Sequence, residues 1–168
     1  MKALALLAAV TAMTFVPPAA VGQPPPLRDK PAPPISLPII ANGSGTFVLA
    51  HQRGHGVYLN FFASWCEPCQ EEAKTLEKVT AGFAGKDVRV IGIAELDEAA
   101  SVMSFARTHG VRYPIALDKN GYVGAAYRMN ELPLHVFIGS NGIIREYVEG
   151  GPIPESELRT GLTEISAP

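Results

Sequence analysis

The two cysteines of this sequence, Cys66 and Cys69, are the residues best suited to chemistry. They are separated by Glu67 and Pro68, and no other cysteine occurs among the 168 residues. Two cysteines at this spacing can form a small-ring disulfide when oxidised and a dithiol when reduced. They cannot form a framework of several disulfides or supply a four-thiolate zinc site. The sulfur chemistry of this chain therefore belongs to one place.

The position of the cysteine pair indicates what each thiol does. The pair follows a buried apolar run at residues 57–62 and opens an amphipathic segment that extends to Phe83. At a helix start, unpaired N–H groups and the helix dipole favour a thiolate at Cys66. We therefore expect Cys66, the more exposed sulfur, to attack a substrate disulfide and Cys69 to resolve the mixed disulfide.

The two residues inside the motif tune this chemistry. The carboxylate of Glu67 disfavours the neighbouring thiolate, which opposes the helix dipole. Since a very stable thiolate makes a strong oxidant, this favours a reductant. Pro68 stiffens the helix start, where its missing N–H is not needed.

A static disulfide and half of a metal site are the alternatives. A bridge over so short a loop stabilises a fold little by chain entropy. A metal needs further ligands, and the histidines show no tight spacing except His51 with His55; the others are His109 and His135. We expect neither a metal nor a cofactor.

The elements around the motif alternate between strand and helix patterns. The expected strands are residues 57–62, 88–94, 115–117, 134–138 and 143–148, and the expected helical segments are 67–83, 102–110, 122–127 and 154–165. Strands joined by helices pair in parallel through right-handed crossovers. Asn141-Gly142 instead predicts an antiparallel hairpin. The sequence therefore predicts an α/β fold with a mixed sheet.

The N-terminus has the pattern of an export signal. Lys2 precedes an uncharged segment, residues 3–16, which is shorter than the ~20 residues that span a bilayer. We expect a signal peptide at 1–22, cleaved after Ala20 or Gly22, with an uncleaved anchor as the alternative. Residues 23–33 are Pro-rich and predict an extended linker, which leaves 34–168 as the folded domain. The protein should then be periplasmic or otherwise extracytoplasmic.

Charge and composition exclude other classes of function. The 14 basic and 16 acidic side chains give a net charge of −2 without a basic stripe, so nucleic-acid binding is not expected. With 47% hydrophobic and 18% charged residues, the chain fits a single globular domain.

Trp65 and the cysteine motif, preceded by residues 59–64, resemble thioredoxin-fold thiol-disulfide oxidoreductases of the TlpA/ResA type. The resemblance implies a three-layer sandwich whose central mixed sheet is flanked by helices. It also implies a monomeric, exported protein-disulfide reductase, supplied with electrons by a membrane dithiol donor. Several members reduce apocytochrome c, so a place in cytochrome c maturation is one expectation.

The resemblance assigns further site residues. Pro133 matches the cis-proline that faces the cysteines, and Leu132 would present its backbone to substrate, beside Trp65, Glu67 and Pro68. Thioredoxin has a buried aspartate where this chain has Asn60, and an amide cannot take a proton. Asp97, at a position where ResA-type proteins carry an acid, and alternatively Glu95, are the candidate proton acceptors for Cys69.

Departures from the family pattern keep other functions open. Lys74 replaces a proline that kinks the first helix in many relatives, Leu134-His135 replaces a polar pair, and Gly139 replaces an aspartate. An oxidase or isomerase on the same fold is one alternative. A non-enzymatic copper-delivery protein, using the two cysteines with His135 or His109, is another.

Overall fold

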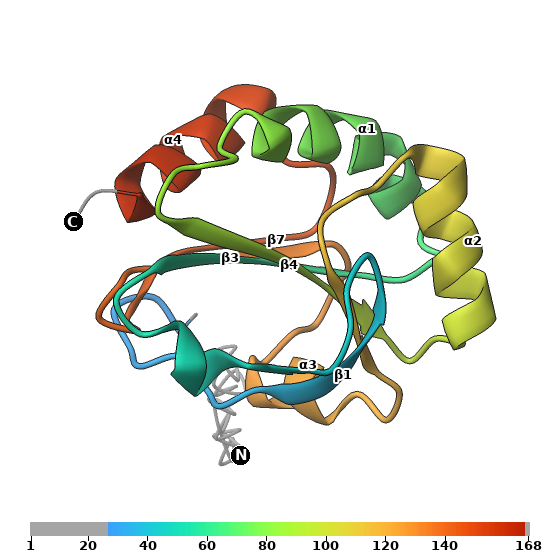
Figure 1. Cartoon of the computed structure of the whole chain (residues 1–168), viewed down its shortest axis with the longest axis horizontal. Coiled ribbons are helices and arrows are strands. Elements are labelled where there is room, and N and C mark those ends of the chain that lie inside the picture. The colour runs from blue at the N-terminus through green and yellow to red at the C-terminus, as the bar shows by residue number, and fades with distance from the viewer. Residues whose placement is uncertain (1–26, 167–168) are drawn as a thin grey trace, which may run out of the picture.

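A seven-stranded mixed sheet organises the computed structural model, which describes residues 27–166 (Figure 1). Its strand order is β2-β1-β5-β4-β3-β6-β7. The strands are β1 (Ser36–Ala41), β2 (Thr46–Val48), β3 (Gly56–Phe62), β4 (Val88–Glu95), β5 (Ile115–Asp118), β6 (Leu134–Ile138) and β7 (Ile144–Glu149). β3, β4 and β5 are parallel and the remaining pairs are antiparallel. The predicted mixed sheet is confirmed.

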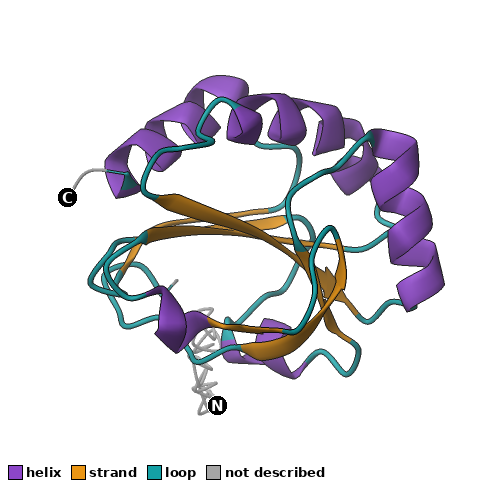
Figure 2. Cartoon of the chain, viewed as in Figure 1, coloured by secondary structure: helices purple, strands orange, loops and turns teal. Residues whose placement is uncertain are grey.

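Helices cover both faces of this sheet, as Figure 2 shows. They are α1 (Glu67–Ala81), α2 (Ala99–His109), the short α3 (Tyr122–Ala126), α4 (Glu155–Ile165) and the 3-10 turn η1 (Leu49–Gln52). α1 and α4 lie together over one face, and α3 lies on the other side. The α/β three-layer arrangement is confirmed, and α1 runs without interruption through Lys74.

The central strand β3 explains why both faces are covered. All seven of its residues are buried. Tyr58 packs with α1 and α4, whereas Leu59 and Phe61 pack in the cluster on the opposite face. Successive side chains of a strand point to opposite faces, so a continuously apolar strand requires a layer on each side. The strand ends at the loop that carries the cysteine motif.

The chain before β3 differs from the expected linker. Leu27 is buried in the core, the backbone N–H of Asp29 donates to the carbonyl of Ile144 at 2.8 Å, and Pro31 forms an isolated bridge with Ile143. Residues 27–33 therefore pack on the hairpin of β6 and β7 instead of forming a free linker. β1, β2 and η1 follow and were not predicted. The expected signal peptide, residues 1–22, lies outside the described residues.

Within residues 27–166, no helix is both long enough and apolar enough to cross a membrane.

Gly161 determines how closely α4 approaches the sheet. A Cβ added at this position would lie 2.6–2.8 Å from ring atoms of Phe137. Gly161→Ala should gain about 1 kcal/mol of helix propensity but cost more through overpacking, about 1–3 kcal/mol, so unfolding should occur at lower denaturant. Thr160→Ala, one residue away on the exposed face, is the control. A Gly161→Ala protein as stable as the control would contradict the close packing.

Candidate active site

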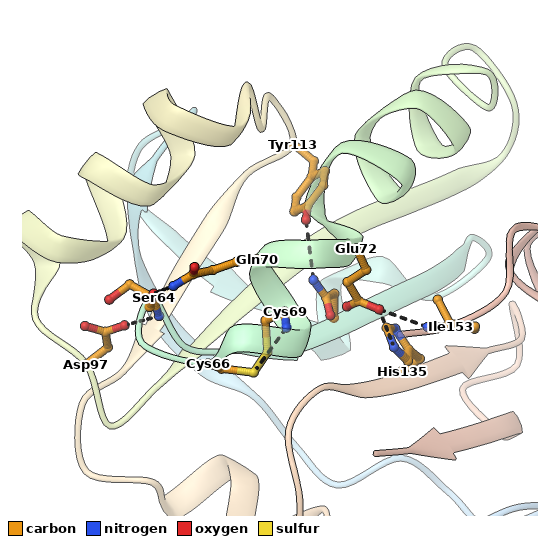
Figure 3. Close-up of a disulfide and its surroundings, with 10 residues drawn as sticks. Ser64, Cys66, Cys69, Gln70, Glu72, Asp97, Tyr113, His135 and Ile153 are labelled. Atoms are coloured by element: carbon orange, nitrogen blue, oxygen red, sulfur yellow. Dashed lines mark hydrogen bonds and ion pairs between the residues drawn. A yellow bond between two sulfur atoms is a disulfide. The ribbon is translucent and has the colours of Figure 1, made fainter. Parts of the chain in front are cut away.

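The two cysteines form a disulfide at the N-terminus of α1 (Figure 3). Cys66 is the N-cap residue, with extended backbone dihedrals, and Pro68 lies in the first turn. The backbone N–H of Cys69 donates to Sγ of Cys66 at 3.3 Å. An N–H group aimed at this sulfur favours a thiolate there when the bond opens, as expected from the helix start.

Solvent reaches the motif through a pocket rather than over an open surface. Cys66 is only 5% exposed and Cys69 only 2%, so Cys66 is less exposed than the sequence analysis assumed. Cys66 nevertheless lines a surface pocket of about 550 Å³, whereas Cys69 does not. Trp65, 64% exposed, stands on its rim. The geometry therefore distinguishes Cys66, which borders the pocket, from Cys69, which does not.

The opposite wall of the pocket comes from the segment before β6. Residues 129–132 line it, and the Leu132-Pro133 peptide bond is cis. Glu67 and Pro68 of the motif line the same pocket. The pocket thus brings together four of the residues that the resemblance assigned to the site, Trp65, Glu67, Pro68 and Leu132, whereas Pro133 supplies the cis bond and does not line the pocket.

Asn60, in the middle of β3, is 3% exposed, and its amide donates to the hydroxyl of Tyr113 at 3.4 Å. Burial is the main factor that raises the pKa of Tyr113, so the phenol stays neutral. Neither side chain can take a thiol proton near neutral pH.

A carboxylate that the sequence analysis did not single out lies beneath the motif. Glu72 is 3% exposed and follows Cys69 by three residues, so both lie on the buried face of α1. Its Oε2 accepts the N–H of Ile153 at 3.0 Å and lies 3.3 Å from Nε2 of His135. The available signal was its place among the apolar positions of the helix, next to Ala73 and before Leu76.

Asp97, the first candidate acceptor, holds the loop in front of the motif. Its Oδ2 accepts the N–H of Ser64 at 2.6 Å, and its Oδ1 accepts the N–H of Glu98 at 2.7 Å. Gln70 donates to the carbonyl of Ser64 from the other side, as Figure 3 shows. Because both carboxylate oxygens are engaged by backbone, these contacts favour a positioning role.

Glu95, the alternative acceptor, is 1% exposed and lines the same pocket as Cys66. It pairs in register with Asp118, whose Oδ2 accepts the N–H groups of Val123 and Gly124. Burial, and then the negative charge of Asp118, raise the pKa of Glu95 from its ordinary 4.5 to about 8. A Cβ at Gly124 would lie 2.6 Å from Oε2 of Glu95, so the glycine makes room for this carboxyl.

The raised pKa of Glu95 predicts a pH dependence of stability. The folded state keeps a proton up to about pH 8 that the unfolded chain loses near pH 4.5. Its contribution is therefore present below pH 4.5 and is lost as the pH rises through 8. Glu95→Gln should remove this loss, so its free energy of unfolding should exceed that of the wild type most at pH 9.

Denaturant titrations at pH 5, 7 and 9 test this expectation. Glu131→Gln, which alters an exposed carboxyl at the same pocket, is the control and should follow the wild type. If the difference in free energy of unfolding between Glu95→Gln and wild type does not grow with pH, the pKa of Glu95 is not raised.

Comparison with known proteins places these residues in a family. The model of the AhpC/TSA family matches residues 29–147, which is most of the chain and includes the whole cysteine motif. The chain belongs to the AhpC/TSA family. Among the described residues of this AhpC/TSA member, no group of three or more His, Cys, Asp or Glu side chains is arranged to hold a metal ion.

Curated relatives of this AhpC/TSA protein carry the name thiol-disulfide oxidoreductase ResA. The chain is 33% identical to ResA of Oceanobacillus iheyensis over 105 residues, which cover 62% of this chain and 55% of the relative. It is 29% identical to ResA of Geobacillus thermodenitrificans over 117 residues, 70% of this chain and 67% of the relative. The chain thus spans little more than half the length of the first of these relatives.

Solved structures confirm the thioredoxin-like fold. MTB dsbF has a TM-score of 0.71 at 25% identity, covering 78% of this chain and 94% of the other. A putative protein disulfide isomerase from Bacteroides thetaiotaomicron has a TM-score of 0.73 at 26% identity, covering 82% of this chain and 89% of the other. A putative DsbE from Chlorobium tepidum gives 0.75 at 23%, covering 83% and 98%, and supports the fold alone.

Proposed function

We propose that this protein is a thiol-disulfide oxidoreductase that reduces protein disulfides by dithiol exchange. The observation that carries the proposal is the Cys66–Cys69 disulfide at a helix start, with Cys66 lining an open pocket and Cys69 shielded behind it. The names of the ResA relatives support the same activity.

The exchange follows from this asymmetry. The Cys66 thiolate attacks a substrate disulfide, forms a mixed disulfide and releases the first substrate thiolate. Cys69 loses its proton and attacks Sγ of Cys66, which closes the Cys66–Cys69 bond and releases the second substrate thiolate. The substrate gains two electrons and the protein loses two. The second step requires a proton acceptor near Cys69.

We assign this acceptor to Glu72, because it lies on the same buried helix face as Cys69. Glu95 lies instead at the Cys66 pocket, where its neutral carboxylic acid can protonate a departing substrate thiolate below about pH 8. Asp97 positions the loop between β3 and α1 through Ser64.

The pocket fits an extended substrate segment. Trp65 and Leu132 offer apolar contacts on its two walls, and the backbone of Leu132 can pair with an extended peptide. A substrate disulfide lying across the pocket would then meet Cys66.

The cellular setting belongs to the same proposal. Residues 1–22 act as an export signal, electrons come from a membrane dithiol donor, and the clients include apocytochrome c. Each extends the resemblance to ResA-type proteins. An oxidising compartment would otherwise leave the cysteine pair as a disulfide, so a donor is required.

The reduction potential distinguishes a reductase from an oxidase. Equilibration with glutathione or dithiothreitol buffers should give a potential close to thioredoxin, about −270 mV, if the protein is a reductant. A potential near about −120 mV would assign it to disulfide formation instead. Copper titration of the reduced protein, with His135→Gln and His109→Gln as variants, tests the copper-delivery alternative.

A further inference from the structure

Three buried polar side chains form a chain beneath the motif. Tyr58 of β3, His135 of β6 and Glu72 of α1 are 0%, 0% and 3% exposed. The Tyr58 hydroxyl lies 2.8 Å from Nδ1 of His135, and Nε2 of His135 lies 3.3 Å from Oε2 of Glu72. Figure 3 shows His135 and Glu72 side by side, to the right of the two cysteines. Such groups are costly to bury, so their arrangement calls for a function or a full set of partners.

The direction of each contact follows from the chemistry of Tyr58. Burial, and then the charge of Glu72, raise the pKa of Tyr58 well above its ordinary value of 10, so the phenol keeps its proton. The hydroxyl therefore donates to Nδ1 of His135, which accepts. The ring proton then lies on Nε2, which faces Glu72.

The two oxygens of Glu72 are treated differently. Oε2 accepts from Ile153 and faces His135, whereas Oε1 is buried and has no hydrogen-bond partner in the described part of the chain. The 3.3 Å approach of Nε2 of His135 to Oε2 of Glu72 is a polar contact and not an aligned hydrogen bond. A buried carboxylate oxygen without a donor leaves an acceptor site unused.

We propose that His135 is a positioning residue for the resolving step: with Tyr58 behind it, His135 holds Oε2 of Glu72 and leaves Oε1 to accept the thiol proton of Cys69. This inference rests on the proposed dithiol exchange and adds to it a residue that the motif does not contain. The groups that face Glu72 are Tyr58 from β3, His135 from β6 and Tyr113 before β5, with Cys69 on its own helix.

The step balances within the proposed reaction. The proton of Cys69 moves to Oε1 of Glu72, and the sulfur electron pair forms the Cys66–Cys69 bond. The bond between Cys66 and the substrate breaks, and its electron pair leaves on the substrate thiolate, which takes a proton from Glu95 or from water. When the dithiol donor re-reduces the pair, the proton returns from Glu72 to Cys69.

Stopped-flow reaction of the reduced full chain with an aromatic disulfide, 5,5′-dithiobis(2-nitrobenzoate), separates the two steps. The first thiolate is released by the attack of Cys66 and the second by the attack of Cys69. In His135→Leu, the first phase should match the wild type within about twofold and the second should slow about tenfold or more. His135→Gln retains a donor near Nε2 and should recover most of the second phase.

The pH profile distinguishes positioning from packing. The pH at which the second phase reaches half its maximum should move in His135→Leu and, by less, in Tyr58→Phe. His51→Gln, an exposed histidine on η1, is the control and should match the wild type. If His135→Leu fails to fold, the pH profiles of His135→Gln and Tyr58→Phe decide the question.

Two negative results have different meanings. Second phases with wild-type rates and pH profiles in all folded variants at positions 135 and 58 would overturn the role of His135. A wild-type protein that releases no thiolate in either phase would instead overturn the proposed function.

Discussion

Cys69→Ala is expected to accumulate mixed disulfides with client proteins, whereas Cys66→Ala should reduce substrate disulfides no faster than the uncatalysed exchange. Cys66 lines the pocket and supplies the attacking sulfur, so its loss removes the first step. Cys69 is 2% exposed beside it and supplies the only intramolecular thiol that can release the adduct. Insulin reduction measures the loss of activity in Cys66→Ala, and non-reducing gels followed by mass spectrometry detect the mixed disulfides on Cys69→Ala.

The trapping experiment has an internal control. Cys66→Ala/Cys69→Ala has no thiol and should capture nothing, so any species that it retains is bound noncovalently. The clients identified on Cys69→Ala would also test the expectation of apocytochrome c. If the wild type reduces disulfides and Cys69→Ala carries no adduct, the mechanism does not proceed through Cys66 as the attacking sulfur.

The central part of the fold follows directly from local sequence patterns. The apolar run at 57–62 predicts β3, the spacing of Leu76 and Val79 predicts α1, and Asn141-Gly142 predicts the turn between β6 and β7. Each pattern reports burial on one or two faces of a single element. The sequence therefore correctly placed the cysteine motif between β3 and α1.

The strands β1 and β2 were not predicted, although both lie inside the expected domain of residues 34–168. Pro38 lies inside β1, and Ile35, Leu37 and Ile39 alternate as a strand requires. β1 pairs with β2 at residues 36–38 and with β5 only from Ile39 onwards, so Pro38 has a paired strand on one side only, as proline has at a sheet edge. The alternation was thus the more informative signal.

The polar groups around the motif were harder to predict because their partners are distant in sequence. His135 and Tyr58 meet Glu72 only when β3, β6 and α1 pack together. The sequence could not decide between Glu95 and Asp97 as proton acceptors, because they are only two residues apart and their contacts come from distant segments. The first ends β4 against Asp118, and the second lies in the loop and binds backbone N–H groups.

Glu72→Gln is expected to slow the resolving step by about 10²-fold or more, the usual contribution of a positioned base, while Cys66 still attacks at the wild-type rate. Glutamine keeps the size of the side chain, and its amide oxygen can accept from Ile153, so the fold should be retained. In this variant, mixed disulfides should persist for longer than in the wild type but should eventually resolve, unlike those of Cys69→Ala. Burst kinetics with insulin or a model disulfide measure both steps.

Glu71→Gln is the matched control, because Glu71 is the preceding residue of α1 and is exposed. It removes the same charge from the same helix without changing the buried face, so it should retain wild-type kinetics. If Glu72→Gln resolves mixed disulfides as fast as this control, the thiol proton goes elsewhere. Glu95 would then be the remaining candidate among the buried acids, since Asp97 already accepts from Ser64 and Glu98, and Asp118 accepts from the N–H groups that open α3. In that case Glu95→Gln, and not Glu72→Gln, should slow the resolving step. The proton acceptor would then lie at the pocket.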